Sequence, residues 1–334
     1  MKQPLTKLLI IAAALLASCS KNADNSPLPQ PTATDSVALI PLTQDWKKAI
    51  HLMKDFPNGV QVFLNKKTIN NKATVMYAVV FDPKLIELKP VTSATNKKVS
   101  DFYNEELSRK FACINGGFFG TNTSYSLSMY NGIISAVNIK ALTRTYNSTN
   151  TSYYPTRAAF GLKADGTPEV AWIYHVGTGN GTIYSYPTVS PNFLNSAPQA
   201  VPSATFPTGA TVWSVNSAIG GSPMLIKNNN INITDEEELI VIDNNASRAR
   251  SAIGYTNNNK VILLAVEGNN PNGGTGLSLA ELAQVMKDMG CAGAINLDGG
   301  GSTSLIVNGT ATVKPSDSGG ERPVITALIL KSKS

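Results

Sequence analysis

The sequence predicts an α+β protein with mixed, largely antiparallel sheets, few helices and a single main domain. Three observations lead to this class: strand-like runs outnumber helical ones, hairpin signals join neighbouring runs, and one clear helix lies between strands near the C-terminus. Of 334 residues, 42% are hydrophobic and 15% are charged, which is typical of a globular protein rather than a disordered one.

The first residues have the pattern of an export signal. Lys2 and Lys7 precede an apolar run over 8–17 that is too short to span a bilayer, and small residues follow it. We therefore expect a signal peptide over 1–18. Residues 19–40 are rich in Pro, Ser, Thr and Asn, so a flexible tether is expected there.

Residues 41–110 are expected to form a helix and strands that lead into the main domain. Residues 43–56 fit a short helix, with Thr43 as its cap and an apolar face. Strand-like runs at 59–65 and 73–82 are separated by the hairpin signal KKTINNK, whereas the pattern over 85–110 is ambiguous.

The main domain is expected over 111–334, with inserted loops at about 121–211. That middle part is rich in Ser, Thr, Asn, Tyr, Pro and Gly and contains only short strand-like pieces. The last third is more regular. A hairpin over 251–268 is followed by the clearest helix, 278–290, in which Ser278 and Glu281 fit a capping box and Gly290 ends the helix.

In this last third, the run AINLDGGGSTSL contains one carboxylate followed by three consecutive glycines. Three glycines after a strand allow positive φ, so their N–H groups can converge on an oxyanion, and two hydroxyls follow. The candidate residues are Asp298, Gly299, Gly300, Gly301, Ser302 and Thr303. The alternative is a tight turn or a close crossing of two backbones.

Two further glycine motifs resemble the first. ACINGGFFG contains Asn115 and Gly116 and is followed by two phenylalanines, which either fill the core or stack on a sugar ring. AIGGSPMLI contains Gly221 between apolar runs. If the hairpin over 251–268 has a two-residue loop, Arg250 lies opposite Glu267, either as a surface ion pair or as a carboxylate held by a cation.

Two cysteines lie beyond residue 40. Cys113 and Cys291 each precede a glycine motif, so we expect them to lie close together, either as a disulfide or as two buried thiols. With only two histidines, a histidine-rich metal cluster or a Ser–His triad is not expected. The formal net charge falls from +6 to +4 once Lys2 and Lys7 are removed, which argues against nucleic acid and suits an anionic substrate.

The motifs NGGFF, AIGGSPML, RSAIG, SLAEL, NLDGGGSTSL and ERPV occur in an order and spacing that resembles the phosphodiester glycosidase family. The resemblance covers roughly 59–330. It implies a hydrolase that removes a sugar, for instance N-acetylglucosamine, attached through its anomeric carbon to a phosphodiester on surface or exogenous glycans. A lipid-anchored glycan-binding protein without turnover is the alternative.

The resemblance also implies roles for the candidate residues. Asp298, Glu267 and Arg250 are expected to be catalytic. Substrate or phosphate binding is expected from Asn115, Gly116, Gly221, Gly299, Gly300, Gly301, Ser302, Thr303 and Arg322. No cofactor is expected to be required, although a divalent cation is left open. Many family members carry Asp-Gly-Arg where this chain has Glu267-Gly268-Asn269, a departure that bears on the substrate.

Cys19 ends the run Leu16-Ala17-Ser18-Cys19, which resembles the lipobox of bacterial lipoproteins. Lipidation there would anchor an exported protein to a membrane on the periplasmic side or at the cell surface, since each buried acyl CH₂ contributes roughly 0.8 kcal/mol. Cys19→Ala should therefore move the protein from the membrane fraction to the soluble fraction. Unchanged fractionation, or a mature N-terminus elsewhere, would contradict lipidation.

Overall fold

Three large sheets build the protein, and every strand pairing among residues 37–240 and 242–333 is antiparallel. These are the residues that the computed structural model describes, so the expected signal peptide and Cys19 lie outside them. The α+β class with largely antiparallel sheets is confirmed. Among the described helices, none is long and apolar enough to cross a membrane.

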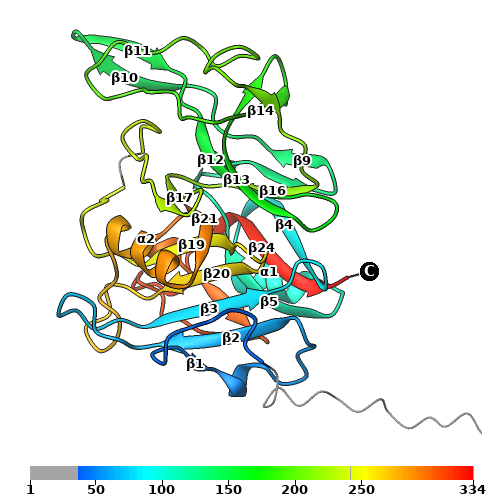
Figure 1. The fold of residues 1–334 in the computed structure, drawn as a ribbon. Helices are drawn as coiled ribbons and strands as arrows, with labels where there is room; N and C mark the ends of the chain where they lie inside the picture. Colours follow the sequence, from blue (N-terminus) through cyan, green and yellow to red (C-terminus); the bar gives the residue numbers. More distant parts are fainter. Residues whose placement is uncertain (1–36, 241, 334) are drawn as a thin grey trace, which may run out of the picture. The chain divides into compact units, whose positions relative to one another are not determined.

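The eight-stranded sheet carries both predicted hairpins (Figure 1). Its order is β1 (Lys47–Lys48), β2 (Val60–Asn65), β3 (Met76–Phe81), β20 (Val261–Val266), β19 (Arg250–Thr256), β21 (Cys291–Asn296), β17 (Met224–Lys227) and β18 (Asn230–Ile231). Residues 41–110 thus supply three adjacent strands on one side of this sheet, from the edge strand β1 to β3.

The five-stranded sheet has the order β23 (Thr310–Ala311), β22 (Leu305–Val307), β5 (Lys110–Asn115), β24 (Val324–Ser332) and β4 (Ile86–Lys97). The ambiguous stretch over 85–110 forms the long β4 and the helix α1 (Val99–Glu105). Helix α1 packs on the outer face of this sheet, where Phe102 and Tyr103 contact Cys113 and Ile329 in one buried cluster.

The seven-stranded sheet comes almost wholly from the middle of the chain. Its order is β15 (Thr211–Val212), β14 (Thr182–Tyr186), β13 (Pro168–Val176), β12 (Arg157–Leu162), β16 (Ser217–Gly220), β8 (Ser128–Tyr130) and β9 (Ile133–Ala136). The expectation that 121–211 only decorates the core is wrong, because Ala158, Phe160 and Trp172 belong to the central core. Two further hairpins pair β10 (Leu142–Tyr146) with β11 (Thr149–Tyr153) and β6 (Phe119–Gly120) with β7 (Thr123–Ser124).

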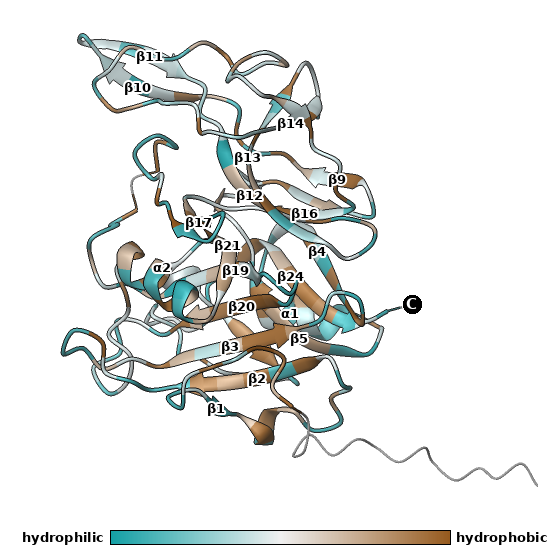
Figure 2. Cartoon of the chain, viewed as in Figure 1, coloured by the Kyte–Doolittle hydropathy of each residue, from teal (hydrophilic) through white to brown (hydrophobic). Residues whose placement is uncertain are grey.

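The central core draws apolar side chains from all three large sheets. Examples are Val79 and Leu263 from the eight-stranded sheet, Leu328 from the five-stranded sheet and Phe160 from the seven-stranded sheet, all fully buried. Figure 2 shows β20 and β24 coloured mostly as hydrophobic, whereas the β10–β11 hairpin is mostly pale or hydrophilic. The three sheets therefore share one interior.

Helix α2 (Leu279–Asp288) confirms the clearest local prediction. The Ser278 hydroxyl accepts a hydrogen bond from the Glu281 N–H at 3.2 Å, and the Glu281 carboxylate accepts one from the Ser278 N–H at 2.9 Å. Gly290 follows the helix with a φ of 85°. The apolar face of α2 covers the outer face of the eight-stranded sheet, where Leu282 and Met286 are fully buried.

The helix expected over 43–56 is wrong. The segment forms only the short β1 and a single 3₁₀ turn, Ile50–Leu52. The cause is a long-range contact, because the Ala49 N–H donates to the Val62 carbonyl at 2.9 Å and extends the edge of the sheet. Tertiary pairing has overridden local helical periodicity.

The expected pairing of Arg250 with Glu267 is also wrong, because Arg250 lies opposite Val266. The connecting loop has three residues, Asn257 to Asn259, rather than two. It is closed by hydrogen bonds from the Thr256 N–H to the Lys260 carbonyl at 2.9 Å and from the Asn259 N–H to the Thr256 carbonyl at 2.8 Å. Asn259 has a φ of 59°, as the third residue of such a loop requires. Because Arg250 shares a face of the sheet with Val266, the next residue, Glu267, is directed toward the opposite face.

Cys113 and Cys291 are free and buried, and the expectation that they lie close together is wrong. Cys113 packs beneath α1 on the five-stranded sheet, whereas Cys291 packs beneath α2 on the eight-stranded sheet. Each thiol faces outward from its sheet, so the interior separates them.

The three glycine motifs meet at one place, which we call the glycine junction: Gly116 and Gly117 after β5, Gly220 and Gly221 at the end of β16, and 296–298 after β21. The Asp298 N–H donates to the Gly116 carbonyl at 3.1 Å. The Ser222 N–H donates to the Asn296 carbonyl at 2.9 Å. The junction therefore joins the ends of strands from all three large sheets.

A β-carbon does not fit in the glycine junction. Placed on Gly117, it would lie 2.3 Å from the Gly220 carbonyl oxygen, and on Gly221 it would lie 2.2 Å from the Asn296 carbonyl oxygen. Both neighbours are backbone atoms, which cannot rotate away as a flexible side chain can. Close approach of the three backbones thus requires glycine.

Gly221→Ala should lower the free energy of unfolding by about 1–3 kcal/mol, the usual effect of overpacking a close-packed site. Gly319→Ala is the matched control, since a β-carbon there meets no atom within 4 Å. Its effect should stay within about 0.5 kcal/mol. Urea unfolding of both variants measures the difference, and equal midpoints would contradict the close-approach argument.

Candidate active site

Asp298 is the carboxylate presented at the glycine junction. It lies two residues after the end of β21 and is partly buried. Burial raises its pKa to about 6, although the Ser302 hydroxyl, the Gly299 N–H and the positive charge of Arg322 act in the opposite direction. The Gly299 N–H donates to Asp298 Oδ1 at 2.9 Å. Asp298 is thus poised to change its ionisation in the range where biological catalysis takes place.

Asn115 holds the backbone that carries Asp298. Its fully buried amide donates to the Asp298 carbonyl at 2.7 Å and to the Gly116 carbonyl at 3.2 Å. The amide oxygen accepts from the Ser251 hydroxyl at 2.7 Å and from the Ser304 N–H at 3.3 Å. These four hydrogen bonds use the side chain fully, so Asn115 positions the site instead of binding a ligand in this state.

The sequence predicted that the N–H groups of the glycine loop converge on one point, but they do not. The Gly300 N–H donates to the Ala249 carbonyl at 2.8 Å, and those of Ser302 and Thr303 donate to Gly299 and Gly300 carbonyls within the loop. Gly300 has a φ of 58°, and Gly300–Ser302 form a 3₁₀ turn. The loop is a tight turn that presents side chains beside Asp298.

Several buried polar atoms around the glycine junction lack a hydrogen-bond partner in the described part of the chain. They are Asn296 Oδ1, Thr303 Oγ1 and Thr326 Oγ1. Thr326 lies against Gly116, which would place a β-carbon 2.3 Å from its hydroxyl oxygen. Buried polar groups are nearly always hydrogen-bonded, so this cluster of unpaired atoms indicates a place built for a polar ligand or water.

Arg322 lies beside the glycine loop and is already paired. Its Nε and Nη2 donate to the two oxygens of Asp317 at 2.8 Å and 2.9 Å in a bidentate contact. The pair covers Gly301, where a β-carbon would lie 2.2 Å from Arg322 Nη2. The guanidinium is still partly exposed, and its charge reaches Asp298.

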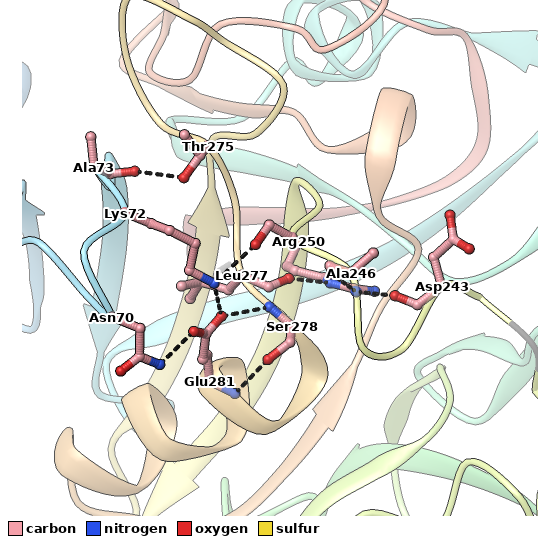
Figure 3. A network of polar contacts seen from close by, with 11 residues as sticks. Asn70, Lys72, Ala73, Asp243, Ala246, Arg250, Thr275, Leu277, Ser278 and Glu281 are labelled. Atoms are coloured by element: carbon pink, nitrogen blue, oxygen red, sulfur yellow. Dashed lines mark hydrogen bonds and ion pairs between the residues drawn. The ribbon is translucent and has the colours of Figure 1, made fainter.

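Arg250 begins β19, and its side chain donates mainly to backbone carbonyls (Figure 3). Nε donates to Leu277 at 2.9 Å, and Nη2 donates to Asp243 at 2.9 Å and to Ala246 at 3.1 Å. Burial lowers its pKa to about 10, which leaves it cationic at neutral pH. The structure therefore brings the Arg250 backbone to the glycine loop while the guanidinium fastens the loop that precedes the strand.

Glu267 follows β20 and is similarly engaged. Its carboxylate accepts hydrogen bonds from the Asn270 amide at 2.7 Å and from the N–H groups of Gly274 at 2.9 Å and Lys314 at 2.8 Å. It thus joins the loop over 268–276 to the segment that leads to Arg322. Of the two predicted carboxylates, Asp298 is the one with fewer hydrogen-bond partners.

Sequence reasoning missed two acidic residues that organise the site. Glu321 accepts from the Ser304 hydroxyl at 3.0 Å and from the Ser100 N–H at 2.9 Å, which ties α1 to the site. Glu238, fully buried, accepts from the Ser222 hydroxyl at 2.6 Å and thereby holds the second glycine motif. The only signal for Glu321 was its place beside Arg322, and Glu238 lies in an acidic run that resembles an exposed loop.

A surface hollow of about 500 Å³ lies away from Asp298. It is lined by Trp46, Met76 and Val285, on the α2 side of the eight-stranded sheet. Across residues 37–240 and 242–333, no group of three or more His, Cys, Asp or Glu side chains is arranged to hold a metal ion.

Comparison with known proteins places this chain in a family. Residues 110–331 match the sequence model of the phosphodiester glycosidase family, which is two thirds of the chain. The chain belongs to this family, and the resemblance drawn from its motifs is confirmed.

Two named relatives are N-acetylglucosamine-1-phosphodiester alpha-N-acetylglucosaminidases. The Mus musculus protein is 34% identical over 110 residues, which cover 30% of this chain and 21% of the relative. The Bos taurus protein is 38% identical over 73 residues, covering 22% and 14% respectively. The matched part spans about a fifth or less of these relatives.

Two solved structures share the fold. The auto-inhibited catalytic domain of zebrafish N-acetylglucosamine-1-phosphodiester alpha-N-acetylglucosaminidase has a TM-score of 0.54 at 18% identity, covering 82% of this chain and 83% of that one. A hypothetical protein from Synechocystis has a TM-score of 0.55 at 18% identity, covering 83% and 63%. At this identity the likeness concerns the fold alone.

The raised pKa of Asp298 makes a prediction about stability. An unfolded aspartate has a pKa near 3.9, so between about pH 4 and pH 6 the folded state holds a proton that the unfolded state has lost. Asp298 therefore destabilises the fold progressively as the pH rises through this window. Asp298→Asn should be more stable than the wild type at pH 7, by on the order of 1–2 kcal/mol after solvent screening, and the gain should vanish near pH 4.

Thermal unfolding between pH 4 and pH 8 measures this difference. Glu236→Gln is the control, since it removes an exposed carboxylate. If the Asp298→Asn and wild-type curves run parallel over the whole range, the carboxyl is not desolvated as described.

Proposed function

We propose that this chain is a hydrolase that cleaves the bond between the anomeric carbon of a sugar and a phosphodiester, with Asp298 as the reacting carboxylate. The observation that carries the proposal is a partly buried carboxylate, with a pKa raised to about 6, at the place where three glycine motifs meet. Membership of the phosphodiester glycosidase family supports this reaction class. The names of the relatives suggest N-acetylglucosamine as the sugar.

The chemistry of the leaving group suits a site with one free carboxylate. Ordinary glycosidases use a second carboxylic acid to protonate an alkoxide. When the C1–O bond of a sugar phosphodiester breaks, the electron pair leaves with a phosphate monoester, whose second pKa is about 6, so little protonation is needed. Glu267 is then not needed as an acid, and its three hydrogen bonds instead hold the loops around the site.

The roles of the remaining residues follow from their contacts. Ionised Asp298 would face the sugar, either stabilising positive charge at C1 or accepting a proton from water. The unpaired hydroxyl of Thr303 is a donor available to substrate oxygens. Arg322 would add positive charge near the phosphate, since its field already reaches Asp298.

The setting of the reaction is a further part of the proposal. Export followed by lipid attachment at Cys19 would place the enzyme at a periplasmic or surface membrane, where surface or exogenous glycans are accessible. This part is supported by the sequence pattern of 1–19 alone.

Purified full-length protein should release sugar from a panel of sugar-1-phosphodiesters. Asp298→Asn should abolish turnover and keep much of the binding, because the amide is nearly isosteric but cannot act as a base. Wild-type kcat/KM should rise with pH through about 6 as Asp298 loses its proton. Parallel reactions with a chelator test for a divalent cation.

Glu236→Gln serves as the control for these reactions. Binding of the sugar phosphodiesters without release by the wild type would replace the enzyme with a lipid-anchored glycan-binding protein. Release at the wild-type rate by Asp298→Asn would remove Asp298 from the chemistry.

A further inference from the structure

Arg157 is a buried cation without a partner. It begins β12 and is 6% exposed. In the described part of the chain it makes no hydrogen bond or ion pair, and its Nε is buried with no acceptor. Burial lowers its pKa to about 10, so the guanidinium stays charged at neutral pH. Charged groups are almost never buried without a counter-charge, which indicates that an acceptor is absent from the unliganded protein.

Glu238, the carboxylate whose charge acts on Arg157, does not serve as its hydrogen-bond acceptor. Glu238 attracts Arg157 electrostatically, yet the two make no contact as close as an ion pair. Five donors already surround the Glu238 oxygens: the N–H groups of Ala158 and Met224, the hydroxyls of Ser222 and Thr234, and the Trp172 indole. Glu238 is therefore committed to holding the polypeptide chain.

The position of Arg157 connects it to the glycine junction. The adjacent Ala158 accepts a hydrogen bond from the Gly221 N–H at 2.9 Å, and the next N–H, that of Ser222, donates to Asn296. Asn296 is two residues before Asp298. Arg157 thus lies in a strand of the seven-stranded sheet, next to a residue that is hydrogen-bonded to the glycine junction.

A second cation lies on the same side. The charge of Arg144, on the β10 strand of the β10–β11 hairpin, lowers the pKa of Arg157, so the two guanidinium groups lie close enough to repel. In contrast, Arg250 and Arg322 have protein acceptors for most of their donors. The guanidinium with all its donors unused is Arg157.

We infer that Arg157 binds an oxyanion of the substrate. If the proposed function holds, that oxyanion is the phosphate of the sugar phosphodiester. Only this identity of the ligand rests on the proposed function. The geometry of a guanidinium suits it, because a planar fork of N–H groups donates to two oxygens at once. A carboxylate on the ligand would accept the same pair of hydrogen bonds, so the test compares phosphate with acetate.

Inorganic phosphate and acetate are titrated into the full-length wild-type chain by calorimetry at constant ionic strength. Arg157→Gln should weaken phosphate binding by about tenfold or more, since a charge-assisted contact is lost. Arg109→Gln is the matched control. It removes the same charge near the start of β5, far along the strand from Asn115, and should change phosphate affinity less than about twofold.

Each outcome decides the inference. Phosphate binding that depends on Arg157 supports a phosphate ligand, and acetate binding that depends on it supports a carboxylate. Equal affinities in wild type and Arg157→Gln, or no binding of either anion by wild type, overturn it. Should Arg157→Gln not fold, Arg157→Lys keeps the charge but loses the fork, and should still bind phosphate more weakly than wild type.

These titrations need no turnover, so the two proposals fail separately. Phosphate binding through Arg157 in a protein that cleaves no sugar phosphodiester would remove the proposed hydrolysis and leave this inference standing. If the wild type hydrolyses sugar phosphodiesters but Arg157→Gln binds phosphate as tightly as wild type, the proposed hydrolysis stands and this inference is overturned.

Discussion

Contact between backbones that leaves no room for a β-carbon is the constraint on which this structure depends. Gly117 lies against the Gly220 carbonyl and Gly221 against the Asn296 carbonyl, so strands from three sheets end at one point. The hydrogen bond from the Asp298 N–H to the Gly116 carbonyl is possible only at this separation. Asp298 is consequently held by backbone from two sheets at once, which fixes its direction more firmly than a loop on one sheet would.

Polar side chains around this point divide into those that hold the chain and those with unused capacity. Glu238 and Glu267 accept hydrogen bonds from neighbouring N–H and O–H groups, and Asn115 both donates to carbonyls and accepts from N–H and O–H groups. Each side chain therefore joins segments that are distant in sequence. Within the described residues, Arg157 Nε and the Thr303 hydroxyl are buried and have no hydrogen-bond partner. A protein tolerates such unpaired groups where a ligand completes them, because leaving them unpaired is otherwise costly.

The parts that local patterns determine were predictable, and the parts set by distant contacts were not. The capping box of α2 and the hairpin over 251–268 follow from residues a few positions apart, and the meeting of the glycine motifs followed from their shared pattern and the family resemblance. The failed helix over 43–56 reflects pairing with Val62, which no local periodicity reveals. Arg250 donates its hydrogen bonds to the backbone carbonyls of Asp243, Ala246 and Leu277, and every residue type has such a carbonyl, so the sequence does not reveal these contacts. For the same reason the unpaired Nε of Arg157 was visible only in three dimensions.

The loop Asn257 to Asn259 gives the hairpin a property that surface loops rarely have. Such loops usually accept insertions and deletions during evolution, because little depends on their length. Here β19 is paired on one side with β20 through this loop and on the other with β21, next to Asp298. Loss or gain of one residue would force β19 to slip against one neighbour and would exchange the faces of Arg250 and Ser251. Natural variation in the family should therefore spare the length of this loop while its three side chains change freely.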